Sequence, residues 1–230
     1  MPQRLHIALF DLDHTLLPID SDYTWTTYTN AMGWTRPEEV EQQNEVFFAQ
    51  YKAGTLDMND YVRFVTQPVR DFSPQQLQAT LQRYVQEYIV PHIRPEALEL
   101  LAQHRAAGET LVMTTATNRL IGGAVGQHLG FAGDHILSTE LQFRDDGRIT
   151  GDVAGEPNLR EGKVHNFGHW LAARGLGYAD VHITFYSDSM NDLPLLEKAD
   201  VPVATNPDDA LRAVAQQRGW RVLDLFETIA

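Results

Sequence analysis

Hydrophobic and polar positions change their period along the chain. Residues 5–10 (LHIALF) form a short apolar run that ends at Asp11, which is typical of a buried strand in a parallel sheet. From residue 20 to about residue 89, aromatic and aliphatic residues recur at helical spacing, so we predict three or four helices there. Thr35 to Glu38, with Pro37 in the first turn, predicts a capping box, and Ser73-Pro74 predicts a second helix start.

After Pro95 the pattern alternates between short apolar runs and longer helical periods. We predict helices over 96–106, 118–129, 162–174 and 208–218, a short helix after Asn191, strands ending at Met113 and over 136–138, 181–186 and 201–204, and a hairpin over 141–151. This alternation predicts the α/β class, with a doubly wound, Rossmann-like parallel sheet. Residues 1–17 and 92–230 would form the core domain, and residues 18–91 an inserted helical cap domain over the carboxyl edge of the sheet.

Composition narrows the classes of partner. The chain has 230 residues, 43% hydrophobic and 21% charged, as in ordinary globular proteins. Its net charge of −13 argues against nucleic acid and against an anionic membrane surface as partners. The absence of cysteine excludes disulfides, thiolate metal sites and a cysteine nucleophile. The apolar run at the N-terminus is too short for a signal peptide, and no run is long enough to cross a bilayer, so we expect a cytoplasmic protein.

Polar residues follow the predicted strands at the points where those strands end. The residues in such positions are Asp11, Asp13, Thr15, Thr114, Thr115, Thr117, Ser187, Asp188, Asn191 and Asp192, and Lys163 begins the helix before the last of these strands. The carboxyl ends of parallel strands meet at one edge of a sheet, where ligands bind. Clustered carboxylates repel each other unless a cation neutralises them, and an all-oxygen set favours Mg²⁺. A lysine with hydroxyls suits a second anionic group, so this edge is suited to a phosphoryl group.

These motifs resemble those of the haloacid dehalogenase superfamily of phosphatases. Asp11-Leu12-Asp13-His14-Thr15-Leu16 is similar to its first motif. The strand ending in Thr115, the isolated Lys163, and Ser187 to Asp192 (SDSMND) are similar to its second, third and fourth motifs. The inserted helices resemble a C1 cap. The first motif followed by Asp20-Ser21-Asp22 resembles subfamily IB, which includes phosphoserine phosphatase and histidinol-phosphatase-like enzymes.

The resemblance implies catalytic and substrate-binding roles for matching positions. Asp11 would be the nucleophile that forms an aspartyl-phosphate, and Asp13 the general acid and base. Thr115 and Ala116 would contact the transferring phosphoryl group, and Lys163 would neutralise its charge. Asn191 would contact the phosphate. Thr114 remains an alternative to Thr115 because the two threonines are adjacent.

The resemblance also implies Mg²⁺ as cofactor. Its ligands would be Asp11, the backbone carbonyl of Asp13, Asp188 and Asp192, with an alternative role for Asp192 in orienting Lys163. The implied activity is hydrolysis of a small phosphorylated metabolite by a monomer or homodimer. A phosphotransferase of the same superfamily and a catalytically inactive protein that binds phosphometabolites remain alternatives.

Two further acids bear on the substrate. Asp20 and Asp22 follow the first motif and are either caps of the first cap helix or substrate contacts. Two carboxylates beside the pocket favour a leaving group with a cationic end, such as histidinol phosphate. Phosphoserine also carries a carboxylate, which would require an arginine, and Arg63 and Arg70 in the cap are candidates.

Overall fold

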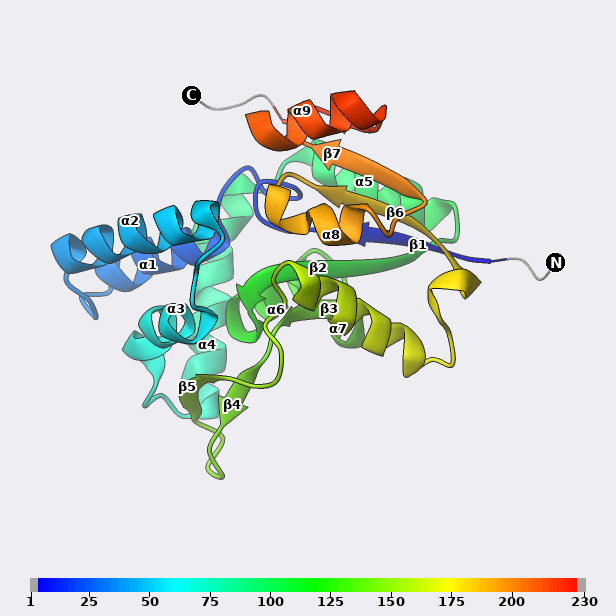
Figure 1. Ribbon diagram of the computed structural model, residues 1–230. Coiled ribbons are helices and arrows are strands. Elements are labelled where there is room, and N and C mark those ends of the chain that lie inside the picture. Colours follow the sequence, from blue (N-terminus) through cyan, green and yellow to red (C-terminus); the bar gives the residue numbers. More distant parts are fainter. Residues whose placement is uncertain (1–3, 227–230) are drawn as a thin grey trace.

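The computed structural model describes residues 4–226, in which six parallel strands form one sheet with the order β3-β2-β1-β6-β7-β8 (Figure 1). These strands are β1 (Leu5–Phe10), β2 (Thr110–Asn118), β3 (Ile136–Thr139), β6 (Val181–Ser187), β7 (Val201–Thr205) and β8 (Arg221–Leu223). Strand order reverses between β1 and β6, and such a switch point opens a crevice at the carboxyl ends of the two strands.

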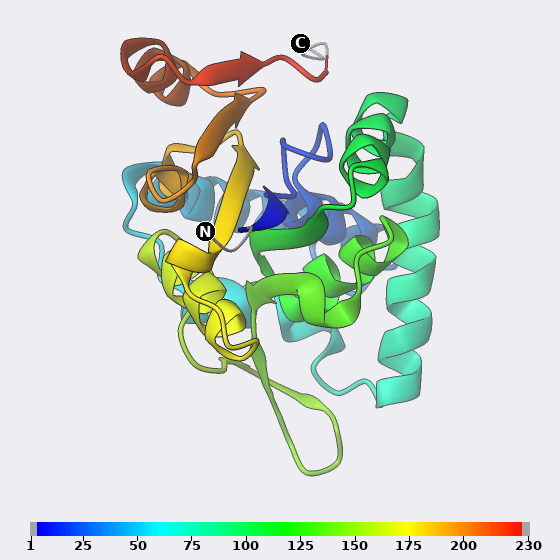
Figure 2. The ribbon, with the colours of Figure 1, turned by 90° about the vertical axis from the view of Figure 1, so that its right-hand side faces the viewer.

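Helices cover both faces of the sheet, as the doubly wound prediction requires. They are α5 (Pro95–Ala106) and α6 (Arg119–His128) on one face, and α7 (Glu161–Ala172), α8 (Leu193–Leu196) and α9 (Asp209–Arg218) on the other (Figure 2). The alternation of β1 explains this: Ala8 and Phe10 pack with α5 and α6, whereas Ile7 and Leu9 pack with α7, α8 and α9. The predicted fold class is confirmed.

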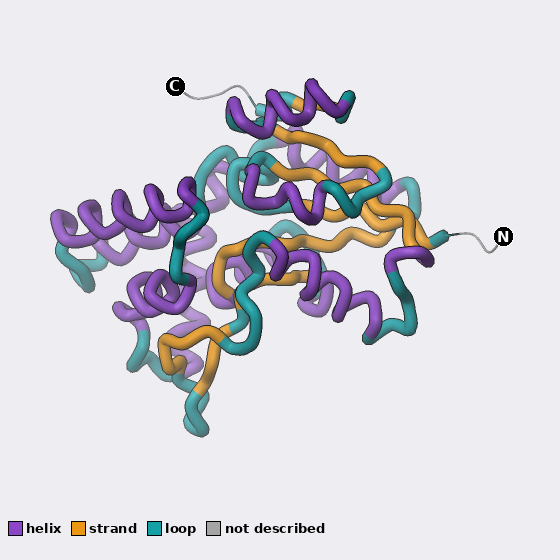
Figure 3. Tube along the Cα trace, in the orientation of Figure 1, coloured by secondary structure: helices purple, strands orange, loops and turns teal. Residues whose placement is uncertain are grey.

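The helical insert lies at the carboxyl end of the strands (Figure 3). It contains α1 (Ser21–Ala31), α2 (Pro37–Ala53), α3 (Met58–Thr66) and α4 (Pro74–Tyr84), the last continuing into a π turn over Val85–Ile89. Tyr84 Oη donates to the carbonyl of Ser21 over 2.6 Å, and Trp25 Nε1 donates to the carbonyl of Val65 over 2.8 Å. These buried bonds hold α1 against α4 and α3. The division into core and cap domains stays a prediction.

A small antiparallel hairpin leaves the core and lies against the cap. It consists of β4 (Leu141–Phe143) and β5 (Ile149–Val153), as predicted, and β5 packs beside α3 (Figure 1). Arg63 of α3 donates from Nε to Asp152 over 2.8 Å. Short 3₁₀ turns occupy Gln67–Val69, Val90–His92, Gly133–His135, Tyr178–Asp180 and Met190–Asp192.

The structure corrects three predictions of local structure. The second strand does not end at Met113 but continues to Asn118, because its pairing with β3 resumes there after an irregularity. The capping box at residues 35–38 is wrong: Arg36 is the N-cap without a side-chain bond, since the Thr35 hydroxyl donates to Asn30. The edge strand β8 was not predicted. The capping box at Ser73, closed by Gln76, is present.

No helix of residues 4–226 combines the length and the apolar character needed to cross a membrane.

Candidate active site

Asp11 and Lys163 form a buried ion pair at the switch point. Asp11 follows β1 directly, and its N–H donates to the carbonyl of Tyr186 in β6 over 2.9 Å. Lys163, in the first turn of α7, places Nζ 2.7 Å from Asp11 Oδ1 and 2.8 Å from the carboxylate of Asp192. Burial alone would lower the pKa of Lys163, but the charges of Asp11 and Asp192 outweigh it and raise that pKa. Lys163 is therefore a fixed cation beside the predicted nucleophile.

Asp192 is the second partner of that lysine. Its carboxylate is buried, and Ser187 Oγ donates to Oδ2 over 2.7 Å. Burial raises the pKa of Asp192 to about 6, against the opposing effect of Lys163. With both contacts directed at protein groups, the geometry supports the alternative in which Asp192 orients Lys163. A role for Asp192 in binding the metal stays a prediction.

Asp11 and Asp188 face one another across the hydroxyl of Thr15. Thr15 Oγ1 lies 3.4 Å from Asp11 Oδ2 and 3.2 Å from Asp188 Oδ1. Burial, together with the charges of Asp11 and Asp192, raises the pKa of Asp188 well above its ordinary value. Within residues 4–226, no ion pair joins Asp188 to a lysine or arginine. The two carboxylates therefore lack a local cation on the side away from Lys163.

That arrangement fits a bound Mg²⁺. Within the described part of the chain, no three His, Asp or Glu side chains group as a metal site. Mg²⁺ commonly takes only one or two carboxylates and keeps several waters, so two acids suffice. Asp11, Asp188 and the backbone carbonyl of Asp13 could hold it. A cation between Asp11 and Asp188 would also relieve the repulsion that raises the pKa of Asp188.

The carboxylate of Asp13 is held by two donors. The N–H of Ser21 donates to Oδ1, and Thr117 Oγ1 donates to Oδ2, each over 2.7 Å. Burial, and next the charge of Asp20, raise the pKa of Asp13 to about 6 although these two bonds oppose the rise. A carboxyl group with this pKa is partly protonated close to neutral pH, which suits an acid that must later act as a base.

The two adjacent threonines of β2 have different surroundings. The hydroxyl of Thr114 accepts a 2.9 Å bond from Nδ2 of Asn158, a fully buried residue that also donates to the carbonyl of Thr115. The hydroxyl oxygen of Thr115 accepts the N–H of Thr117 over 3.1 Å, as in a tight turn at the strand end. Because the Thr114 hydroxyl is bonded behind the strand, the geometry favours Thr115 as the hydroxyl that faces the site. Ala116 lies between Thr115 and Thr117 in this turn.

Asp20 and Asp22 have separate roles in the structure. Asp20 is the N-cap of α1, and its Oδ1 accepts the N–H of Tyr23 over 2.8 Å, so the capping alternative is confirmed for Asp20. Asp22 is buried, with Asn118 Nδ2 3.3 Å from its Oδ1 and Tyr61 beside it. Burial, followed by the charges of Asp20 and Asp13, raises the pKa of Asp22 well above its ordinary value. Substrate contact by either acid stays a prediction.

The side chain of Asn191 contacts both Arg160, at the start of α7, and Tyr51 of the cap. Its Oδ1 accepts a 2.9 Å bond from Arg160 Nε, and its Nδ2 lies 3.4 Å from the carbonyl of Tyr51 in the cap. Arg160, Tyr51 and Asn158 were not predicted, because a lone arginine, tyrosine or asparagine carries no pattern. Thr117, which was expected at this strand end, is there and donates to Asp13.

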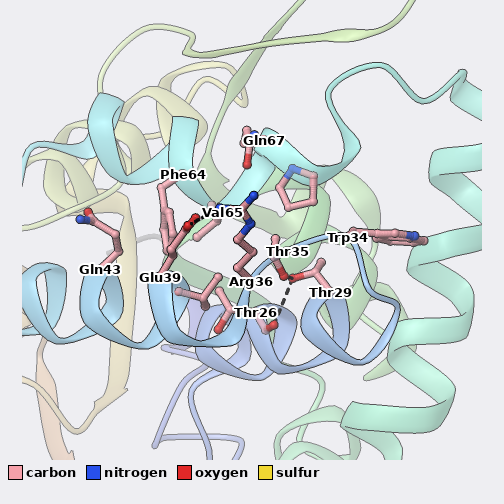
Figure 4. A pocket seen from close by; sticks show the side chains of 12 residues that line it. Thr26, Thr29, Trp34, Thr35, Arg36, Glu39, Gln43, Phe64, Val65 and Gln67 are labelled. Atoms are coloured by element: carbon pink, nitrogen blue, oxygen red, sulfur yellow. Dashed lines mark hydrogen bonds and ion pairs between the residues drawn. The ribbon is translucent and has the colours of Figure 1, made fainter.

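A pocket of about 330 Å³ lies within the cap, between α1, α2 and α3, apart from this cluster of acids (Figure 4). Thr26, Thr29 and Trp34 are among its lining residues. The hydroxyls of Thr26 and Thr29 already donate to carbonyls of α1, over 2.7 Å and 3.0 Å. The predicted catalytic side chains do not line this pocket, so it is not the catalytic site.

Comparison with known families identifies the class of protein. The profile of the haloacid dehalogenase-like hydrolases matches residues 8–197, most of the chain and all four motifs. The chain therefore belongs to the haloacid dehalogenase-like hydrolases. The predictions of family and of a phosphatase-type hydrolase are confirmed at that level.

Curated relatives and solved structures agree with this assignment. A histidinol-phosphatase of Neisseria meningitidis serogroup C is 39% identical over 220 residues, covering 95% of this chain and 98% of that protein. Phosphoserine phosphatase SerB1 of Mycobacterium tuberculosis is 34% identical, covering 94% of this chain and 70% of its own. A protein of unknown function from Bordetella pertussis Tohama I superposes with a TM-score of 0.89 at 38% identity, covering 97% of this chain and 100% of its own. A substrate-bound phosphoserine phosphatase has a TM-score of 0.65 at 17% identity, covering 96% and 94%, and shares the fold.

Proposed function

We propose that this protein is a Mg²⁺-dependent phosphatase that hydrolyses a small phosphate monoester through an aspartyl-phosphate on Asp11. The observation that carries the proposal is the fixed group of Asp11, Lys163 and Asp188 at the switch point. Lys163 Nζ lies 2.7 Å from one oxygen of Asp11, and the Thr15 hydroxyl lies between the other oxygen and Asp188. A nucleophilic carboxylate thus has a cation on one side and a metal-binding carboxylate on the other.

In the first step, a carboxylate oxygen of Asp11 attacks phosphorus, and the bond from phosphorus to the alcohol oxygen breaks. Asp13 donates its proton to the departing oxygen, so that a neutral alcohol leaves. Ser21 N–H and Thr117 Oγ1 keep the Asp13 carboxyl in one orientation for this transfer. Lys163 and the hydroxyl of Thr115 stabilise the negative charge on the phosphoryl oxygens.

In the second step, Asp13 takes a proton from water, and the resulting hydroxide attacks phosphorus. The acyl-phosphate bond breaks, which restores Asp11 and releases inorganic phosphate. A Mg²⁺ ion held by Asp11, Asp188 and the Asp13 carbonyl would supply Lewis-acid stabilisation of the phosphoryl oxygens. Two easier displacements thereby replace one very slow hydrolysis.

For the leaving group we propose an amine-bearing alcohol, with histidinol phosphate as the first candidate. The support is Asp22, a buried acid at the base of the cap whose nearest charged neighbours are the acids Asp20 and Asp13. A substrate ammonium beside Asp22 would favour its ionised form and pair with it, against the burial and the neighbouring acids that raise its pKa. The 39% identity to a histidinol-phosphatase over nearly the whole chain supports the same substrate.

Phosphoserine is the second candidate, supported by the likeness to phosphoserine phosphatase SerB1. Its carboxylate would need a cation, and the two candidate arginines, Arg63 and Arg70, are directed elsewhere. Arg63 bonds Asp152 of the hairpin, and the guanidinium of Arg70 lies against Gly151. Since both arginines are directed at the hairpin, the geometry favours a substrate without a carboxylate.

The test compares kcat/KM for histidinol phosphate, phosphoserine and a neutral sugar phosphate, with Mg²⁺ and with excess EDTA. We expect histidinol phosphate to be preferred and EDTA to abolish turnover. Asp22→Asn should reduce the preference about tenfold or more, since a charged hydrogen bond is worth about 1.5–3 kcal/mol. Asp20→Asn tests the other acid separately: asparagine caps a helix as well as aspartate does, so a lost preference in this variant would indicate substrate contact by Asp20.

Preference for the sugar phosphate, unchanged by either variant, would contradict the amine assignment. Full activity in EDTA would contradict the metal assignment. Transfer of phosphate to an added alcohol in place of water would identify a phosphotransferase, and absence of turnover on all substrates would favour the binding protein.

A further inference from the structure

Arg160 has a backbone conformation that arginine seldom adopts. Its φ is 55° and its ψ is −121°, a region that glycine enters readily and other residues enter only under strain. It is also the N-cap of α7, and its side chain makes no bond to that end of the helix. Strain of this kind persists where other contacts compensate it, and it concentrates at functional sites.

The compensating contacts cross from the core to the cap. Arg160 Nε donates to Asn191 Oδ1 over 2.9 Å, and Nη1 donates to the carbonyl of Gly54 over 3.1 Å. Gly54 is the C-cap of α2, so the guanidinium meets the negative end of that helix. A Cβ on Gly54 would clash with the Arg160 guanidinium, which shows how closely the guanidinium packs on this glycine.

Two more contacts join the same segments. Tyr51 Oη lies 3.2 Å from Ser189 Oγ, and Asn191 Nδ2 lies 3.4 Å from the carbonyl of Tyr51. Arg160, Tyr51, Gly54, Ser189 and Asn191 therefore form one connection, the α2 junction. It stands one helical turn from Lys163 and joins the end of α2 to the loop that carries Asp188 and Asp192.

We propose that Arg160 is a positioning residue. By bonding both the end of α2 and Asn191, it fixes the position of the phosphate-contacting side chain relative to the cap. The proposal rests on the proposed function and on the phosphate contact that the family resemblance implies for Asn191. Asn191 has its carbonyl oxygen occupied by Arg160, and this leaves its amide group available to the site and to Tyr51. The backbone strain at residue 160 is the cost of directing the guanidinium to both partners.

The test is Arg160→Gly, which accepts the backbone conformation and removes the guanidinium. We expect the melting temperature to stay equal to that of the wild type or to rise, while kcat/KM falls about 10- to 100-fold from misplaced groups. The inhibition constant of inorganic phosphate should rise in parallel. Hydrogen exchange should increase at residues 50–55 and 189–192 and remain unchanged elsewhere.

Arg105→Ala is the matched control. Arg105 Nη2 also donates to carbonyls beyond a helix end, those of Leu129 and Gly130, but on α6 and outside the α2 junction. It should leave kcat/KM and phosphate inhibition unchanged.

The kinetic, melting and exchange measurements on Arg160→Gly can each overturn the positioning role. If Arg160→Gly keeps wild-type activity and local exchange, or if it lowers the melting temperature and raises exchange throughout, the positioning role is wrong. If the wild type hydrolyses no phosphate monoester, the proposed function fails. Hydrogen exchange at residues 50–55 and 189–192 in Arg160→Gly then tests by itself whether Arg160 holds these two segments together. Increased exchange would support this role, and unchanged exchange would overturn it.

Discussion

The hydroxyl of Thr117, at the end of β2, donates to Asp13 Oδ2 over 2.7 Å and so links the second strand to the predicted acid and base beyond the first. This bond favours the ionised carboxylate and opposes the burial that raises the pKa of Asp13 to about 6.

Thr117→Val should therefore raise the pKa of Asp13 further. Because leaving-group protonation needs the acid form of Asp13, the alkaline limb of the kcat/KM profile should move to higher pH, and kcat should fall about tenfold or more through lost orientation. Thr117→Ser keeps the hydroxyl and should retain the wild-type profile. A pH–rate profile measured for both variants is the check, and an unmoved alkaline limb in Thr117→Val would count against this role of Asp13.

The two threonines of β2 should differ sharply on substitution. Thr115→Val removes the hydroxyl that we propose contacts the phosphoryl group, and kcat should fall about 10²- to 10³-fold, as for the loss of one stabilising donor. Thr114→Val removes only the acceptor of Asn158, so it should affect stability more than kcat. Steady-state kinetics and urea unfolding of both variants separate the two roles. Equal kinetic losses would show that the assignment to Thr115 is wrong.

Loss of Lys163 should affect rate and stability together. Lys163→Met leaves Asp11 and Asp192 buried without their cation, and breaking a buried pair costs about 3–5 kcal/mol of unfolding free energy. The rate should fall about 10²- to 10³-fold. Lys198→Met, at an exposed lysine, is the control for both measurements. A fully active Lys163→Met enzyme would mean that another cation serves the site.

The buried acid Asp22 should make stability depend on pH. Its folded-state pKa is raised by burial, so the stability it contributes is complete below its unfolded pKa of about 4 and is lost as pH rises toward the folded pKa. The stability of Asp22→Asn relative to wild type should thus increase by about 1.4 kcal/mol per pH unit over that range and then level off. Denaturant unfolding between pH 4 and pH 8 measures this slope, and a difference independent of pH would show that Asp22 is not a buried acid.

The part of the site that lies at the ends of strands could be predicted from the sequence. Asp11, Asp13 and Asp188 directly follow apolar runs, and parallel pairing of β1 with β6 brings them together. The start of a helix before β6 placed Lys163 near this edge. Its pairing with Asp11 could be predicted only from the family motif, because no local pattern shows that α7 directs it there. Asp22 could not be distinguished from a helix cap, since its burial depends on how α1 packs on α3 and β2.

Contacts that depend on tertiary packing could not be predicted from the sequence. Asn158 donates to two strands from a loop, and Arg160 contacts a helix more than 100 residues earlier in the chain. Neither has a spacing that would indicate its partners. The edge strand β8 was missed because Arg221–Leu223 is too short for its period to be distinguished.

The central claim is that Asp11 becomes phosphorylated during turnover. Rapid acid quenching of the Mg²⁺-loaded enzyme with its preferred phosphate monoester, followed by peptide mass spectrometry, tests this most directly. We expect a base-labile phosphoryl group on the peptide that contains Asp11, and neither the adduct nor turnover in Asp11→Asn. Turnover at near wild-type rates by Asp11→Asn, or a phosphoryl group on a different residue, would contradict it.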